Sequence, residues 1–303
     1  MSTADLETAT SPTPSAARVQ LAAVTHWFRL LRSELRLTFG RKRNLVLLAV
    51  LAAVPVLLGL VLRFSSGASN GGGGGGGNGN APAFLSQVTG NGVFLAFLTL
   101  VVESTLILPL VVAIVTGDSI AGEANRGTLR YLLTVPSGRT RLLGIKLTAN
   151  VAFCVGACLL VSAVAVAVGA ILFPVGPVTL LSGNAVPLGE GLLRLLFVTL
   201  YLAAAMAALG AIGLAISTFT EHPIGAIAAV LVIALASEVA DSVSQLDAIH
   251  PYLPTHWWLS FDALLRVPIV WPELGHGLLS FAVYIVIFGS VAWARFTTAD
   301  VTS

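Results

Sequence analysis

Long apolar runs alternate with short polar segments along most of the chain. A transmembrane helix needs about 20 mainly apolar residues, and six runs come close to that length or exceed it. These runs predict spanning helices at 45–62, 92–116, 147–173, 192–218, 224–243 and 278–294. The sixth is slightly short, and the fifth has the weakest signal. The predicted fold class is therefore an all-α polytopic membrane protein with six transmembrane helices.

The polar segments predict how the rest of the chain is organised. Residues 1–20 are rich in Ser, Thr, Ala and Pro and lack a basic start and an apolar core. This composition predicts a disordered tail rather than a signal peptide. Seven consecutive glycines fall within 65–82, which predicts a flexible linker. Residues 21–296 then form one transmembrane domain, and 297–303 form a short second tail.

A helical pattern of another kind precedes the first apolar run. Between residues 24 and 43, apolar and aromatic side chains recur at helical spacing, while arginines fall on the opposite side. An aromatic apolar face with an arginine-rich back is typical of a helix that lies in the membrane interface. An ordinary cytosolic helix is the alternative. The predicted membrane-interface residues are Trp27, Phe28, Arg29, Arg32 and Arg36.

The segment 240–277, between the fifth and sixth runs, mixes aromatic residues with prolines. Because Trp and Tyr favour the membrane interface, we expect short helices that lie at the outer interface or dip into it. The segment also holds histidines and aspartates, and metal binding is an alternative interpretation. These residues are His250, His256, His276, Asp247 and Asp262. Their spacing matches no closed zinc site, so no metal ligand is predicted.

Composition and charge placement support this topology. Apolar residues make up 56% of the chain and charged residues 10%, whereas a soluble domain has about 25% charged residues. With the N-terminus in the cytoplasm, all but three of the 16 basic residues lie on the cytoplasmic side. The exceptions are Arg63, Arg194 and Arg266. The positive-inside rule thus predicts a multi-pass plasma-membrane protein with both termini in the cytoplasm. No pattern indicates nucleic-acid binding.

One charged segment, 117–146, stands between the second and third predicted spans. Within it, a short helix is predicted from Thr128, which can cap its start, to just before Pro136, which would stop it. The apolar stripe of this helix consists of Leu129, Leu132 and Leu133. A short helix with an apolar stripe, surrounded by charge, indicates a surface that docks on a partner.

Catalytic and nucleotide-binding motifs are missing from the sequence. It contains no GxxxxGK[ST], Gly-x-Ser-x-Gly or HExxH pattern, which argues against an enzyme and against ATP binding by this chain. Any energy would come from an ion gradient or from another chain. Glu103, near the middle of the second span, is the clearest ionisable residue inside the membrane, where a charge costs about 2.5–3.5 kcal/mol. It is a candidate for a substrate path; a carboxyl bonded to a neighbouring helix, through Thr99, is the alternative.

The charged segment resembles that of ABC transporter permeases of the type-2 class. In those proteins the segment carries an acidic residue, Gly-Thr-Leu, a Leu-Leu pair, Pro, Arg and Lys in this order. The matching residues here are Glu123, Arg126, Gly127, Thr128, Leu129, Leu132, Leu133, Pro136, Arg139 and Lys146. Together with the six spans and the amphipathic segment, the resemblance covers about residues 24–295. The glycine insert departs from the pattern, but it is predicted to be extracellular.

The resemblance implies a mechanism. The helix at 128–135 would be a coupling helix that docks on a separate cytosolic P-loop ATPase, and 24–43 would be the connecting helix. The short helices before the sixth span would be re-entrant. Two permeases, identical or different, would form the pathway; ATP and Mg would bind in the ATPase, and this chain would bind no cofactor.

The implied function is that of a permease subunit of an ATP-driven exporter for a lipophilic or amphipathic substrate. Two alternatives stay open at this stage. One is a gradient-driven secondary transporter with Glu103 as its relay. The other is a non-transporting membrane subunit for assembly or maturation.

Overall fold

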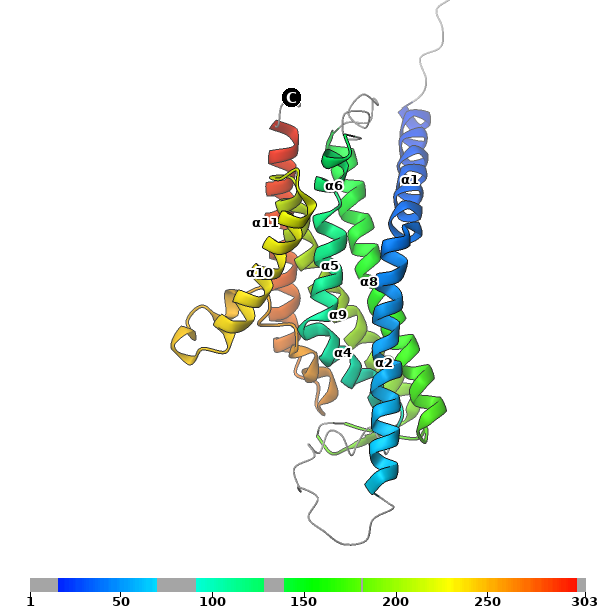
Figure 1. Cartoon of the computed structure of the whole chain (residues 1–303). Coiled ribbons are helices and arrows are strands. Elements are labelled where there is room, and N and C mark those ends of the chain that lie inside the picture. The colour runs from blue at the N-terminus through cyan, green and yellow to red at the C-terminus, as the bar shows by residue number, and fades with distance from the viewer. Residues whose placement is uncertain (1–15, 70–90, 128–138, 181, 299–303) are drawn as a thin grey trace, which may run out of the picture.

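A computed structural model describes residues 16–69, 91–127, 139–180 and 182–298 as a bundle of long helices (Figure 1). Its helices, in chain order, are α1 (Ala16–Gly40), α2 (Lys42–Ser69), α4 (Phe94–Thr105), α5 (Ile107–Gly117), α6 (Ala121–Asn125), α8 (Arg139–Leu172), α9 (Leu188–Ser217), α10 (Pro223–Asp241) and α11 (Trp271–Thr298). The predicted coupling helix, the glycine run and most of both predicted tails lie outside the described residues.

Five helices of the described part are long and apolar enough to cross a membrane: α2, α8, α9, α10 and α11. Their bounds confirm five of the six predicted spans to within a few residues at most ends. The largest difference is at α8, which begins eight residues before the predicted span, at Arg139. α2 continues as one helix through Pro55.

The second predicted span is not one straight helix. It consists of α4 and α5, which meet at Leu106 with a bend of 54°. Pro109 explains the break, because it has no N–H to donate to the carbonyl of Thr105 four residues earlier and its ring crowds that carbonyl. Leu106 itself leaves the helical region, with φ −143° and ψ −50°. The predicted span at 92–116 is therefore a bent helix pair in the structure, and its break was not predicted.

Helix α9 forms the centre of the bundle and is buried along most of its length. Its sequence is rich in Ala and Gly, and small residues let helix backbones approach closely where apolar burial gives no driving force. At Gly213, an added Cβ would clash with the Thr116 hydroxyl oxygen of α5. In contrast, many apolar side chains on α2, α10 and α11 are exposed, as expected for surfaces that face lipid or another subunit.

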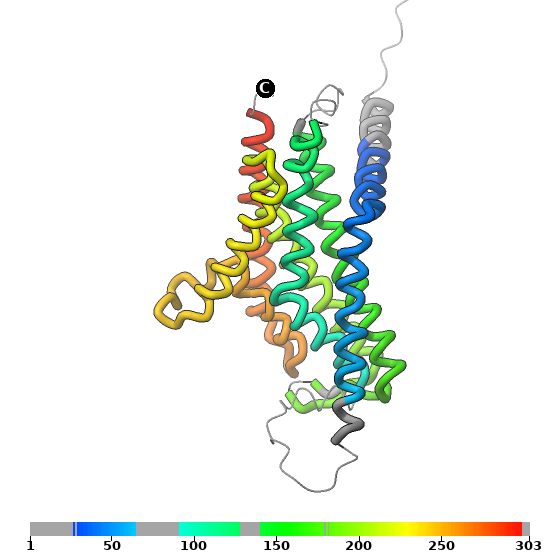
Figure 2. The backbone as a smooth tube through the Cα atoms, in the orientation of Figure 1, coloured from blue at the N-terminus to red at the C-terminus, as the bar shows by residue number. Residues whose placement is uncertain are grey.

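Between α10 and α11 the chain forms three short 3-10 helices, where short helices were predicted. They are η1 (Ser244–Leu246), η2 (His250–Tyr252) and η3 (Ser260–Leu265). The first part of this segment projects sideways from the bundle in Figures 1 and 2. The last part returns to it and buries Phe261, Leu264 and Leu265. A two-residue antiparallel ribbon, β1 (Val178–Thr179) with β2 (Ala185–Val186), precedes α9.

Helix α1 does not take the orientation expected of a helix lying flat in the interface. It continues the direction of α2 along the bundle (Figure 2). Its apolar side packs on α8, where the rings of Phe39 and Phe153 lie 5.6 Å apart. Amphipathic spacing identified the helix correctly, but it could not distinguish a bilayer surface from a neighbouring helix as the partner of the apolar face.

The two ends of the bundle carry different elements (Figure 1). One end holds α1, α6, the start of α8 and the end of α11, and we call it the α6 end. The other holds the β1–β2 ribbon and the start of α9, and we call it the ribbon end. This shared placement of α1 and the end of α11 agrees with termini on one side of the membrane.

Candidate coupling site

The structure describes only some of the predicted coupling residues, because residues 128–138 are outside the described part. Glu123 lies in α6, and Arg126 and Gly127 follow it at the α6 end. Gly127 has φ 70°, a conformation that glycine adopts at little cost. Thr128, Leu129, Leu132, Leu133 and Pro136 lie outside the described residues. Arg139 begins α8, but its side chain is also outside the described part.

Ser217, the last residue of α9, forms hydrogen bonds with the turn between α5 and α6. Its hydroxyl oxygen accepts hydrogen bonds from the backbone N–H groups of Ile120, at 3.1 Å, and Ala121, at 2.8 Å. The same hydroxyl donates to the carbonyl of Gly117 at 2.8 Å. The first N–H groups of a helix have no partner within it, so a side chain from another helix caps α6.

Lys146 of α8 joins three elements through a buried ammonium group. Its Nζ donates to Glu123 Oε1 of α6 at 2.8 Å and to Glu34 Oε1 of α1 at 3.0 Å. The lysine side chain is only 2% exposed. A buried charge is tolerated when it is paired and hydrogen-bonded, so these two carboxylates hold Lys146 in place. Conversely, Lys146 holds α1 and α6 together.

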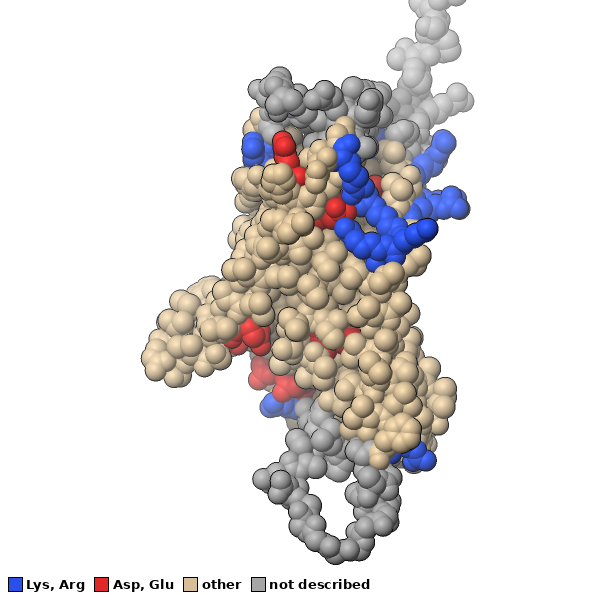
Figure 3. Space-filling model, in the orientation of Figure 1, with Lys and Arg blue, Asp and Glu red and all other residues tan. Residues whose placement is uncertain are grey.

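A second ionic group lies next to the first and is centred on Asp118, the residue after α5. Its carboxylate is nearly buried and its Oδ2 atom meets three guanidinium groups. Arg41 and Arg43, at the α1–α2 junction, approach it to 3.0 Å, and Arg126 approaches it to 3.2 Å. Figure 3 shows basic side chains gathered on the surface at the α6 end.

These contacts surround the root of the predicted coupling segment. Within ten residues before residue 128, the chain is bonded to α1 and α8 through Lys146, to the α1–α2 junction through Asp118, and to α9 through Ser217. We call the residues Glu34, Asp118, Glu123, Lys146, Arg41, Arg43, Arg126 and Ser217 the root cluster. The root cluster therefore joins the chain just before residue 128 to α1, α2, α8 and α9.

The predicted interface residues of α1 lie outside the root cluster. Arg29, Arg32 and Arg36 are exposed, and no carboxylate of the described residues forms an ion pair with them. Trp27 is half-buried, and the side chain of Phe28 is outside the described part. The three arginines thus add positive charge to the α6 end without fastening α1 to it.

Glu103 lies in α4, two residues before its end, and is fully buried. Neither carboxylate oxygen has a hydrogen-bond partner among the described residues. The alternative of a bond through Thr99 is not supported, because the Thr99 hydroxyl donates to the carbonyl of Leu95 at 2.8 Å. Glu103 is therefore a buried carboxyl of α4 that helix packing leaves without a partner.

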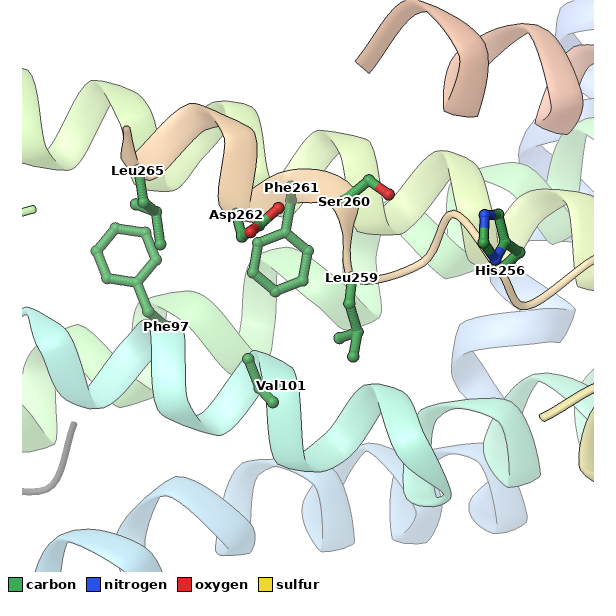
Figure 4. Close-up of a pocket in the computed structure, with 8 residues that line it drawn as sticks. All are labelled: Phe97, Val101, His256, Leu259, Ser260, Phe261, Asp262 and Leu265. Carbon is green, nitrogen blue, oxygen red and sulfur yellow. The ribbon is translucent and has the colours of Figure 1, made fainter. Parts of the chain in front are cut away.

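A pocket of about 390 Å³ opens beside α4 (Figure 4). One wall is α4, and the other is the returning segment between α10 and α11. Its lining residues are Phe97, Val101, His256, Leu259, Ser260, Phe261, Asp262 and Leu265. Figure 4 shows Phe97 and Val101 pointing across the pocket toward the apolar side chains of the opposite wall. Glu103 does not line it.

Two polar side chains of this pocket, His256 and Asp262, contact charged neighbours. His256 Nδ1 lies 2.6 Å from Asp241 Oδ1, and Asp262 accepts a hydrogen bond from Arg266 at 2.6 Å. The remaining lining is mostly apolar. Among the described residues, no group of three His, Cys, Asp or Glu side chains is placed to hold a metal ion.

Sequence reasoning identified Glu123, Arg126 and Gly127 but missed other members of the root cluster. Glu34, Asp118 and Ser217 were not singled out, and Lys146 was only part of a motif. A signal existed for Asp118, since it and Glu123 are the two carboxylates just before the arginines of a basic segment. Ser217 carried no signal, because its partners are about 100 residues away.

The geometry defines a class before any comparison is made: a multi-pass helical membrane domain with a charged turn between two spans. A family model described as "ABC-2 family transporter protein" matches residues 87–246, more than half of the chain. The chain belongs to this family and is a transporter permease subunit, not a catalytic one. The matched region includes α6, Lys146 and the α4 wall of the pocket. No curated protein matches the chain.

Proposed function

We propose that the chain is the permease subunit of an ATP-driven exporter that works with a separate cytosolic P-loop ATPase. Family membership implies an ABC ATPase partner. The observation that carries the finer proposal is the root cluster, which ties α1, α8 and α9 to the chain just before residue 128. A docking element is useful to a transporter only if its movement reaches the spanning helices.

In this proposal, ATP binding closes the ATPase dimer and displaces the helix predicted at 128–135. The ion pairs of Lys146 and Asp118 carry that displacement to α1, α2 and α8, and the Ser217 hydrogen bonds carry it to α9. The bundle then changes between inward and outward access, a rigid-body transition biased by ligand. ATP and Mg bind in the partner ATPase. This chain contacts the ATPase and transmits its movement to the spanning helices.

The proposed orientation places the α6 end in the cytoplasm of a cell whose plasma membrane the helices cross. Basic side chains gather at this end (Figure 3), as the positive-inside rule requires of cytoplasmic segments. Both termini and the predicted coupling helix would then face the ATPase, and the β1–β2 ribbon would face outward.

A second permease, identical or related, completes the pathway in this proposal. The exposed apolar surface of α10 supports such a partner, because Ile224, Val232 and Val239 are more than 60% exposed. One bundle alone leaves most of the surface of these side chains uncovered by protein. Lipid covers the equivalent surface of α2.

The substrate is proposed to be lipophilic or amphipathic. The pocket beside α4 supports this class, since a largely apolar lining with few polar groups suits an apolar molecule. Membership of an ABC family favours ATP over an ion gradient as the energy source. A role for Glu103 in the substrate path stays a prediction, because it is buried on α4 but does not line the pocket.

Leu129→Asp and Leu132→Asp test the function directly. An aspartate in the apolar stripe should prevent docking, so the ATPase should no longer co-purify and ATP-driven transport in reconstituted vesicles should stop. Val175→Asp, an exposed apolar position at the ribbon end, is the matched control and should retain both activities. Full ATP-driven transport by the two stripe variants would refute the coupling assignment. Transport that persists without the ATPase but needs an ion gradient would favour a secondary transporter.

A further inference from the structure

A narrow crevice enters the α6 end between the α1–α2 junction, the end of α5 and α8. Its volume is about 20 Å³, and hydrogen-bond donors dominate its polar lining: Arg41, Arg43, Lys146 and Asn150. The carboxylate of Glu34 also lines it, but Lys146 already engages that group at 3.0 Å. A space of about 10–15 Å³ or more accepts one water-sized atom, so the crevice admits a single oxygen.

Asn150 of α8 provides a hydrogen-bond donor in the crevice lining that the described residues leave unsatisfied. The residue is 4% exposed, and its side-chain nitrogen is buried with no hydrogen-bond partner among the described residues. Leaving a buried donor unsatisfied is costly, and such groups in native structures call for an explanation. An acceptor oxygen entering the crevice from outside would supply the missing bond.

The charge around the crevice selects a negatively charged oxygen. Asp118 provides one carboxylate for three guanidinium groups, and the side chains of Arg41, Arg43 and Arg126 remain 31%, 41% and 51% exposed. These arginines therefore keep solvent-accessible surface, and with Lys146, Glu34 and Glu123 counted the root cluster carries one net positive charge. Guanidinium groups are well matched to phosphate oxygens.

The surface beside the crevice indicates where the phosphate comes from. Directly after Arg43, helix α2 exposes Leu45, Val46 and Val50. In Figure 3 the blue basic surface borders the uncharged surface of the bundle. A phosphate bound at the arginines would thus continue into apolar chains along α2, which is the form of a phospholipid. Basic residues near a membrane surface attract anionic lipids.

We infer that this crevice and the arginines around it bind the headgroup phosphate of an anionic phospholipid. One phosphate oxygen accepts from Asn150 and the Arg41 and Arg43 guanidinium groups, and Arg126 contacts the headgroup from outside. The acyl chains lie along α2. Bound lipid then neutralises the surplus charge next to Asp118 and holds the α1–α2 junction against α8. The inference concerns binding alone and does not depend on transport.

The test is native mass spectrometry of the full chain, purified in detergent with equal amounts of phosphatidylcholine and phosphatidylglycerol. The wild-type chain should retain phosphatidylglycerol in preference to phosphatidylcholine. Arg43→Gln and Asn150→Leu should each lower that retention about fivefold, the effect of losing roughly one charge or hydrogen-bond contact. Arg63→Gln, which removes an exposed charge at the other end of α2, is the matched control and should retain the lipid.

Other outcomes would overturn the inference. Equal retention of both lipids would exclude selection for an anionic headgroup, and equal loss in Arg63→Gln would indicate diffuse attraction. Displacement by millimolar inorganic phosphate would identify a site for a soluble anion. Loss of ATPase co-purification in Arg43→Gln and Asn150→Leu, with lipid retention unchanged, would make the surface a protein-docking site. Should Arg43→Gln fail to fold, Asn150→Leu keeps every charge and still tests the crevice.

Discussion

At the α6 end, helices are joined by ion pairs and hydrogen bonds, of which those of Lys146 are buried, whereas the pocket beside α4 is closed mainly by apolar side chains. Lys146 and its two carboxylates occupy fixed positions, since each group needs its partner. Phe97 and Phe261 need only a surface of suitable shape. The difference fits the two roles proposed above. The α6 end would transmit a displacement in defined directions, and the pocket would accommodate molecules of varied shape.

The largest effect is expected for Lys146→Met, which removes the centre of the ionic contact. Glu34 and Glu123 would then face each other across a nearly buried space without a cation, a situation that costs about 3–5 kcal/mol. The free energy of unfolding, measured with denaturant in detergent micelles, should fall by that amount.

The chain's other lysine provides the control. Lys42→Met alters an exposed residue and should change the free energy of unfolding by less than about 0.5 kcal/mol. Adding Glu34→Gln and Glu123→Gln to Lys146→Met should restore part of the loss. If Lys146→Met and Lys42→Met are equally stable, the α6 end is not held by this ion pair.

A smaller loss is expected for Ser217→Ala. The substitution leaves the N–H groups of Ile120 and Ala121 buried without an acceptor, at a cost of about 1–3 kcal/mol. Hydrogen exchange at these two amides should accelerate, as measured by mass spectrometry of the peptide that contains them. Ser242→Ala, at an exposed position whose hydroxyl bonds only to the carbonyl of Val239, should leave that exchange rate unchanged. Unchanged exchange in Ser217→Ala would remove α9 from the transmission path.

The smallest effect on stability is expected at the pocket. Leu259→Trp places a larger side chain at a half-exposed position of the lining and should alter the free energy of unfolding by about 0.5 kcal/mol or less. It should nevertheless fill part of the pocket and reduce substrate-stimulated ATP hydrolysis by the complex. Leu246→Trp, exposed in η1 and outside the pocket, should not. Equal stimulation in both variants would place the substrate elsewhere.

Much of the fold follows from apolar run length alone, because a bilayer demands helices of fixed length. The bend at Leu106 was missed even though Pro109 was visible, since proline inside a span does not always break it, as Pro55 in α2 shows. The direction of α1 could not be predicted, because one apolar face fits a bilayer or a helix equally well. The contact between Lys146 and Glu34 joins residues 112 apart, and no local pattern encodes such a pairing.

The break between α4 and α5 has a consequence for how this chain can change over time. α4 forms a wall of the pocket, while α5 leads into Asp118 and α6, and the backbone hydrogen-bond ladder between them is interrupted at Leu106. A substitution that twists or shifts α4 is therefore not transmitted rigidly to the ion pairs. Under the proposed function, substitutions that change substrate preference can accumulate in the pocket beside α4, while the α6 end keeps its fit to the same ATPase.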